Sequence, residues 1–442
     1  MQKKIVAIAA TLVCAGALPV WAQTASPSKV ELWGIVDAAV RHTNNEGANK
    51  GGLTKMMGGG MSQSRWGIKV EEDLGGGTKA LVELENRFNA DDGSVSTPFF
   101  QLAYVGLQGP YGRLTMGRQW NVLFDVVTST YASFPYSPYM EAYKPELGMA
   151  AGARSSNALK YTLATPDRKW VGTLQYSFKE GNTTTNVDNA VVTLGDLVLG
   201  APGASAAASA AAGNAVLAGL GGGVPAPLQP AYTDLVNQIN ATAGGAYKTA
   251  GGFLRFSQNG ISVGAGFLRT YLPGGSDLDA WTLGGSYRKN KLYVNIGYGL
   301  NKLKTPKVNP ASAADVFKSY ARDLVDRGIV NSMWQGQTNG GFQVGDSDKR
   351  QMVKVGFGYQ LTPQINAGMH YFRAKQSGSV SGASNGTSNM MVAAVDYAFS
   401  KRTDAYVAVD RTTVSGGQAV FIDLASQTRN RTGFTVGLRH RF

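Results

Sequence analysis

Charged side chains recur at alternate positions in several stretches of this sequence, with apolar side chains between them. Arg65 and Lys69 follow this alternation in one stretch, and Glu83, Glu85 and Arg87 follow it in the next. Because alternate residues of a strand point to one side, both signs of charge gather on one face there. Such side chains attract and sort ions in water rather than make or break bonds.

Motifs for catalysis or metal binding do not occur in the sequence. The three histidines, His42, His370 and His440, lie far apart, and no G-x-S-x-G, phosphate-binding glycine loop or H-E-x-x-H motif is found. A single cysteine, Cys14, rules out a thiolate metal site. We therefore expect no enzyme, no cofactor and no metal. The catalytic alternative is a hydrolase whose nucleophile and base are brought together by the fold.

The first 22 residues have the composition of an export signal. Two lysines precede an apolar stretch, and the segment ends on a small residue. We predict a signal peptide over residues 1–22, cleaved after Ala22; the apolar run is short for the alternative, a retained anchor helix. Cleavage would remove the cysteine and two lysines. Residues 23–442 would then hold 40 basic and 29 acidic residues, a net charge of +11.

The composition argues for strands. Glycine accounts for 57 of 442 residues, nearly twice its usual share of roughly 7%, and glycine weakens helices. The 19 Tyr, 17 Phe and 7 Trp are too many for a disordered chain. Beyond the signal there is no apolar run of the 18 residues or more that a membrane helix needs.

Short turns and long loops alternate along the chain. Seven short segments, most of them containing Gly, Pro, Asn or Asp, have the composition of hairpin turns. Eight longer connections lie between them, near residues 42–60, 89–98, 120–153, 181–245, 272–277, 303–348, 376–386 and 415–430. This alternation of turns and loops predicts sixteen strands, near residues 29–41, 61–72, 78–88, 99–108, 113–119, 154–165, 169–180, 246–258, 260–271, 278–289, 291–302, 349–361, 364–375, 387–399, 404–414 and 431–442.

Turns at one end and loops at the other are typical of a transmembrane β-barrel. A sheet in lipid must pair both of its edges and therefore closes. We predict an all-β fold, one antiparallel barrel of sixteen strands over residues 23–442; soluble sandwiches or solenoids, the alternative, seldom alternate so regularly. Charges facing lipid would cost about 2–4 kcal/mol each at the midplane. The charged faces therefore point inward, and a barrel of this size holds water.

Four stretches of the predicted strands have a distinctive sequence: Val30-Glu31-Leu32-Trp33-Gly34-Ile35-Val36-Asp37-Ala38, Ser64-Arg65-Trp66-Gly67-Ile68-Lys69-Val70-Glu71-Glu72-Asp73-Leu74-Gly75, Gly112-Arg113-Leu114-Thr115-Met116-Gly117-Arg118-Gln119 and Val436-Gly437-Leu438-Arg439-His440-Arg441-Phe442. They resemble strands of the general porins of Gram-negative bacteria, most closely the betaproteobacterial type. The resemblance extends over the whole mature chain. It implies a homotrimer of sixteen-stranded barrels in the outer membrane, through which ions and small hydrophilic solutes diffuse passively.

The resemblance also implies a constriction. The third long loop, residues 120–153, would fold into the lumen and carry Asp125 and Glu141. Basic side chains on the wall would face it, and we expect these to be Arg65, Arg87, Arg118 and Lys69. The terminal Phe442 would be the signal that the barrel-assembly machinery reads.

Other functions stay open at this point. The loops 181–245 and 303–348 are long for a compact porin and would also suit a substrate-selective channel or a structural or adhesive barrel. External basic residues would contact lipopolysaccharide phosphates. A basic chain could bind nucleic acid, but an export signal and amphipathic strands argue against it.

Overall fold

Antiparallel strands make up most of the chain in a computed structural model. The structure describes residues 28–46, 49–133, 145–179, 247–306, seven residues between 323 and 334, 347–422 and 427–442. The strands are β1 Lys29–Glu46, β2 Gly51–Met57, β3 Arg65–Gly75, β4 Thr78–Phe88, β5 Val95–Gly109, β6 Gly112–Trp120, β7 Arg154–Ala164, β8 Trp170–Ser177, β9 Lys248–Gln258, β10 Ile261–Tyr271, β11 Asp277–Lys289, β12 Leu292–Lys304, β13 Lys349–Gln360, β14 Ile365–Ser377, β15 Gly386–Ala398, β16 Thr403–Gly416 and β17 Asn430–Arg441.

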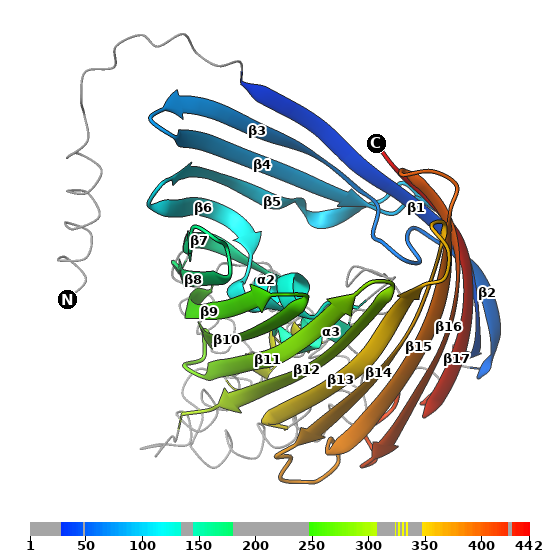
Figure 1. Ribbon diagram of the computed structural model, residues 1–442. Helices are drawn as coiled ribbons and strands as arrows, with labels where there is room; N and C mark the ends of the chain where they lie inside the picture. The colour runs from blue at the N-terminus through cyan, green and yellow to red at the C-terminus, as the bar shows by residue number, and fades with distance from the viewer. Residues whose placement is uncertain are drawn as a thin grey trace.

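The strands close into a ring. From β3 onward each strand pairs antiparallel with the next, and β17 pairs with β1 from Ile35 opposite Arg441 to Thr43 opposite Gly433. The elements β2 and β3 both pair with the other edge of β1, so they form two pieces of one barrel strand. The seventeen elements therefore occupy sixteen places, and the predicted sixteen-stranded barrel is confirmed (Figure 1).

The first long connection differs from the prediction. Residues 42–60 are mostly strand, because β1 continues to Glu46 and β2 returns along it. The next strand, predicted from residue 61, begins only at Arg65. Polar residues at the end of β1 suggested a loop, but a strand that extends beyond the bilayer can carry polar side chains on both faces.

Side chains alternate between the two faces of the wall. On the outer face Leu32 and Leu438 are 63% and 54% exposed, whereas Asp37 and Thr435 on the inner face are 0% exposed. This is the apolar-out, polar-in pattern of a membrane barrel. None of the helices in the described part of the chain is long and apolar enough to cross a bilayer.

The aromatic side chains divide between the faces. Trp170, Trp281 and Tyr397 lie on the outer surface, as expected for interfacial girdles. Four others point inward instead, because each contacts a side chain or carbonyl group inside the lumen. They are Trp33, Tyr104, Trp120 and Tyr293.

Turn and seam positions show why glycine is needed locally. Asn259 and Gly260 both have positive φ, 53° and 80°, in the turn between β9 and β10, as a two-residue hairpin requires. At the barrel seam, Gly34 and Phe442 exchange two backbone hydrogen bonds of 3.1 Å. The Phe442 ring occupies the space of a side chain at Gly34, where a Cβ would lie 2.3 Å from it.

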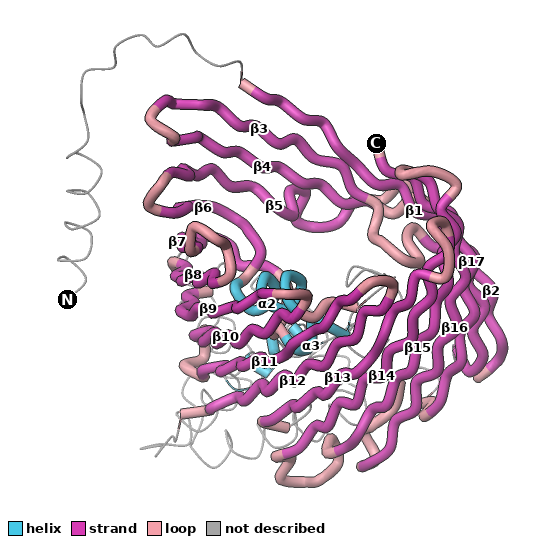
Figure 2. Tube along the Cα trace, viewed as in Figure 1, coloured by secondary structure: helices cyan, strands magenta, loops and turns pink. Residues whose placement is uncertain are grey.

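The two helices of the third long loop lie inside the ring. Helix α2, Val122–Thr130, follows β6 directly, and α3, Pro145–Met149, precedes β7. Figure 2 shows both helices enclosed by the strands. The described parts of the loop that was predicted to enter the lumen, residues 120–133 and 145–153, lie there.

Candidate pore and its constriction

Helix α2 is docked on a glycine-lined part of the inner wall. A Cβ at Gly264 would come within 2.6 Å of Val126 Cγ2, and one at Gly297 within 2.6 Å of the Tyr131 ring. Side chains cannot approach so closely, so only glycine lets the helix and the residues after it lie against the strands. The inward glycines that touch this loop are Gly264, Gly266, Gly284, Gly297 and Gly299.

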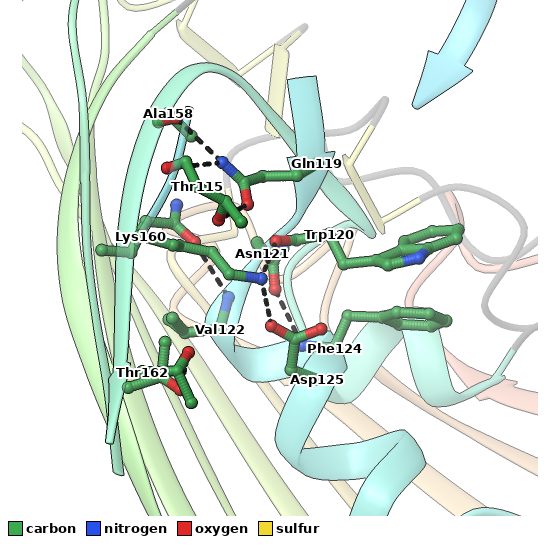
Figure 3. A network of polar contacts seen from close by, with 12 residues as sticks. Thr115, Gln119, Trp120, Asn121, Val122, Phe124, Asp125, Ala158, Lys160 and Thr162 are labelled. Atoms are coloured by element: carbon green, nitrogen blue, oxygen red, sulfur yellow. Dashed lines mark hydrogen bonds and ion pairs between the residues drawn. The ribbon is translucent and has the colours of Figure 1, made fainter. Parts of the chain in front are cut away.

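Polar contacts fix where α2 begins (Figure 3). Asn121 is the N-cap, and its side chain accepts a hydrogen bond of 2.8 Å from the Phe124 N–H. From the neighbouring strand β7, Lys160 donates to the Trp120 carbonyl at 3.0 Å and forms an ion pair with Asp125. The helix is thus held to the wall at its first turn, with one carboxylate facing the lumen.

The end of the loop is held by a buried ion pair. Glu146 of α3 is 1% exposed and lies 3.1 Å from the Lys354 ammonium of β13. It also accepts a hydrogen bond of 3.2 Å from the Ser133 N–H. Burial alone would raise the pKa of Glu146, but the Lys354 charge and Ser133 keep that pKa below its ordinary value. The carboxylate is therefore charged and anchors the loop.

A cavity of about 330 Å³ remains between the exposed face of α2 and strands β5 to β9. Arg113, Lys160 and Arg255 contribute three positive charges to its lining, and Asp125 contributes the negative charge. The other described lining residues are polar or aromatic: Tyr104, Thr115, Gln119, Trp120, Thr128, Ser129, Thr162, Thr173 and Phe253, with Val171 the aliphatic exception. The lining is mostly polar and carries more positive than negative charge.

The opposite part of the inner wall is closed. Arg41 of β1 binds Asp410 of β16 with two hydrogen bonds, 2.8 and 3.2 Å long, and both residues are at most 3% exposed. Arg439 of β17 is similarly paired with Asp404. Charges of both signs line this wall as well, but each of these faces a fixed partner and not the cavity.

Comparison with known proteins now decides the family. The family model for Gram-negative porins matches residues 9–417. The chain belongs to the Gram-negative porin family. Members of this family are channels of the outer membrane, and family membership confirms the expectation that the chain is not an enzyme.

Relatives and solved structures agree with this porin assignment. Outer membrane porin protein 32 of Delftia acidovorans is 31% identical over 169 residues, which cover 36% of this chain and 45% of that protein. The matched part thus spans less than half of that relative. An anion-selective porin from Comamonas acidovorans has the same fold, with a TM-score of 0.61, 19% identity, and 94% and 100% of the two chains covered. OmpT of Vibrio cholerae, solved in a trimer form, has a TM-score of 0.56 and 12% identity, with 94% of this chain and 100% of that chain covered.

In this porin, two of the predicted basic residues lie side by side. Arg65 of β3 stands opposite Arg87 of β4, and both are buried on the inner face. Arg87 donates to Glu85 at 2.7 Å, and its guanidinium lies 5.2 Å from the Trp120 ring centre. Arg154 lies 4.2 Å from the same ring. A cluster of arginines therefore surrounds Trp120 where the loop leaves the wall.

Arg118 has a different position. It pairs with Ala103 of β5, two residues along from the pair Val105 and Met116, whose side chains are 47% and 50% exposed on the outer surface. Its guanidinium donates to Ser156 Oγ at 2.6 Å. The alternation of β6 thus turns Arg118 outward. Arg118 is therefore not part of the constriction, in contrast to our prediction.

The remaining predicted residues divide into two groups. Lys69 lies on the inner face near the short turns, 3.8 Å from Glu83 and 47% exposed. Asp125 lies on α2 in the cavity. Glu141 lies outside the described residues, as do the signal segment 1–22 with Ala22 and the loop 181–245; of the loop 303–348 only parts are described.

Three cavity residues were missing from the sequence-based set. Lys160, Arg113 and Arg255 each alternate with apolar neighbours, as Lys160 does between Leu159 and Tyr161. The same period of two that identified Arg65 marks them as inward. What the sequence lacks is the position of α2, which decides which inward charges border open space.

Proposed function

We propose that this porin forms a water-filled channel through which ions and small hydrophilic solutes diffuse passively, with a preference for anions. The observation that carries the proposal is the cavity beside α2, where three cationic side chains and one carboxylate face water. Charged side chains lining a narrow passage select the ions that pass it. The anion selectivity named for the Comamonas porin supports the same direction.

The excess positive charge comes from two arginines. Lys160 and Asp125 neutralise one another, whereas neither Arg113 nor Arg255 forms an ion pair among the described residues. Arg113 donates to the Tyr104 hydroxyl at 2.9 Å. Each guanidinium thus keeps its full charge in a confined space, where attraction for a passing anion exceeds that in bulk water.

The test is the reversal potential of single channels in a planar bilayer under a salt gradient. The wild type should favour chloride over potassium, and the double variant Arg113→Ala, Arg255→Ala should shift the reversal potential toward cations. Lys401→Ala, in the exposed turn between β15 and β16, is the matched control and should change nothing. A cation-selective wild type would contradict the anion preference.

Liposome swelling separates the general channel from its alternatives. Graded small sugars should enter at rates that fall with size. Swelling by one solute alone, with saturable block of current, would instead indicate a substrate-selective channel. No swelling at all would indicate a structural or adhesive barrel.

The proposal extends to assembly. We take the functional unit to be a homotrimer, as in the trimer form of the Vibrio protein. Outward-facing Arg118 supports this, because a charge facing lipid would cost about 2–4 kcal/mol at the midplane. A protein neighbour would remove that cost. Crosslinking in native membranes followed by electrophoresis tests the trimer.

Export and membrane contacts belong to the same proposal. Residues 1–22 would direct export and be cleaved after Ala22, and Phe442 at the seam would be read by the barrel-assembly machinery. Lys302 and Lys304, exposed on the outer face at the loop end of β12, would lie level with lipopolysaccharide phosphates. Mass spectrometry of the mature N-terminus and assembly of a Phe442→Ala variant test the first two points.

A further inference from the structure

A second segment of chain enters the lumen, separate from the third loop. Ile35 of β1 pairs with Arg65, and Ala39 of β1 pairs with Met57. Three residues lie between Ile35 and Ala39, whereas the seven residues 58–64 lie between Met57 and Arg65. All seven are buried. The surplus chain leaves the sheet on its inner face; we refer to residues 58–64 as the strap.

Asp37 and Tyr406 hold the strap from the wall. The Asp37 carboxylate accepts hydrogen bonds from the N–H of Gly60 at 3.1 Å and of Ser62 at 2.7 Å. The Tyr406 hydroxyl donates to Asp37 at 2.5 Å and accepts from the N–H of Met61 at 3.1 Å. Backbone N–H groups of the strap, which have no strand partner, thus form hydrogen bonds with buried side chains, as a fixed conformation requires.

Close packing reinforces this hold. Gly60 lies so near the wall that a Cβ there would meet the Tyr406 hydroxyl at 2.3 Å and Ala39 Cβ at 2.8 Å. Arg439 of β17 donates to Ser62 Oγ at 2.6 Å while it pairs with Asp404. The strap is therefore attached to three neighbouring strands, β1, β16 and β17.

The strap also reaches the arginine cluster. Gln63 accepts a hydrogen bond of 2.7 Å from Arg87 Nη1, and its amide donates to Ser96 Oγ at 3.2 Å. Arg87 in turn lies over Trp120, which lines the cavity. Gln63 accepts from Arg87 without adding a second negative charge to that of Glu85, because an amide carries no charge.

We propose that the strap is a second constriction element, which narrows the channel opposite α2 and uses Gln63 as the positioning residue for Arg87. The strap adjoins β1 and α2 packs on β10, and these strands stand eight places apart in either direction around the ring of sixteen. The two elements therefore face each other across the lumen. This inference rests on the proposed channel function.

Shortening the strap tests the narrowing. Residues 58–64 are replaced by three residues, so that the strand continues opposite the three residues of β1. Single-channel conductance should rise by about 1.5-fold or more, because the lumen widens on one side. Tyr406→Phe keeps the ring and removes the hydroxyl, and should raise current noise; Tyr397→Phe on the outer face is its control and should leave the noise unchanged.

Gln63→Ala tests the positioning of Arg87. The ratio of anion to cation permeability should fall by about twofold while conductance stays within error, since the charge remains but loses one of the contacts that hold it in place, the ion pair with Glu85 being unchanged. Gln258→Ala, an exposed amide near a short turn, should change neither value.

The outcomes separate two failures. A conducting wild type whose Gln63→Ala and Tyr406→Phe variants match it in permeability ratio and noise would overturn the strap proposal alone. These two variants decide the question if the shortened strap does not fold. A wild type that conducts no ions would overturn the proposed function itself.

Discussion

The inner wall formed by β5 to β9 and the inner wall formed by β16, β17 and β1 contain the same kinds of charged residue in different settings. On the first wall Arg113 and Arg255 border a cavity of about 330 Å³. On the second, Arg41 and Arg439 are fixed in buried ion pairs with Asp410 and Asp404. On the first wall the charges border open space, and on the second they link neighbouring strands.

The difference teaches that an inward charge is not by itself a pore charge. A buried pair is expensive to break, because the partner left behind stays desolvated. A pair beside water is worth much less to the fold. The same substitution should therefore affect stability on one wall and selectivity on the other.

The largest effect is expected for Asp410→Ala. It leaves the Arg41 guanidinium without its carboxylate partner in a site where both side chains are at most 3% exposed. The free energy of unfolding should fall by about 3–5 kcal/mol. The measurement is urea unfolding in detergent, followed by the electrophoretic shift between folded and unfolded barrel.

The control for this variant is Asp167→Ala, which removes an exposed pair with Lys169 in a short turn. It should leave the unfolding midpoint unchanged. Equal midpoints for the two variants would show that the second wall does not depend on its ion pairs.

Gly297→Ala is expected to have the next largest effect, since it acts where both described ends of the third loop touch β12. The added Cβ would lie 2.6 Å from the Tyr131 ring and 2.8 Å from Met149 Cε. Overpacking of this kind costs about 1–3 kcal/mol. We expect a lower unfolding midpoint and, because the loop is pushed inward, a smaller conductance.

Gly172→Ala is its matched control. A Cβ there would be 3.6 Å from Leu254 Cδ1, an ordinary contact. Should Gly297→Ala behave like Gly172→Ala, the docking of the loop would not depend on glycine.

A buried carboxylate also occurs at the mouth, above the strands between the two walls. Asp326 accepts hydrogen bonds from the N–H of Gly274 at 2.8 Å and of Ser276 at 3.1 Å. Burial raises the pKa of Asp326 to about 6, with a smaller contribution from Asp323; Tyr247 also interacts with this carboxylate.

Protonation should therefore favour the docked state of Asp326. Because its carboxyl pKa is raised, the docked state binds more protons than the opened state between about pH 4 and pH 6. Docking therefore strengthens as pH falls through this window. The change is at most about 1.4 kcal/mol per pH unit. Hydrogen exchange of the Gly274 and Ser276 N–H groups measures how the stability of the docked state changes with pH. Asp326→Asn should abolish this dependence, and an unchanged pH profile in that variant would contradict the assignment.

The sequence was sufficient to predict the barrel because period two and the turn residues are local signals. The seam at Phe442 and the inward direction of Arg65 and Arg87 follow from the same signals. The strap does not, since the sequence predicts residues 58–60 as the end of a loop and residues 61–64 as the start of a strand, and only the pairing of β1 with both β2 and β3 reveals it.

Arg118 shows a limit of the family resemblance. Its stretch resembles a porin strand, yet Arg113 and Arg118 are an odd number of residues apart, so period two places them on opposite faces, and β6 keeps this alternation through Gly117. The cavity arginines were predictable as inward. Their open surroundings were not, because these depend on where α2 docks.

The smallest effect on stability, and the sharpest contrast between the walls, is expected for Asp125→Asn. Asp125 and Lys160 form a pair beside the cavity, with side chains 26% and 11% exposed, so its loss should cost about 1 kcal/mol or less. The neutral amide leaves the Lys160 charge uncompensated, and anion preference should rise. Lys160→Met should shift the reversal potential the other way, because it leaves the carboxylate. Asp410→Asn should lower stability without moving the reversal potential, and a selectivity change in that variant would mean that the second wall faces the permeation path too.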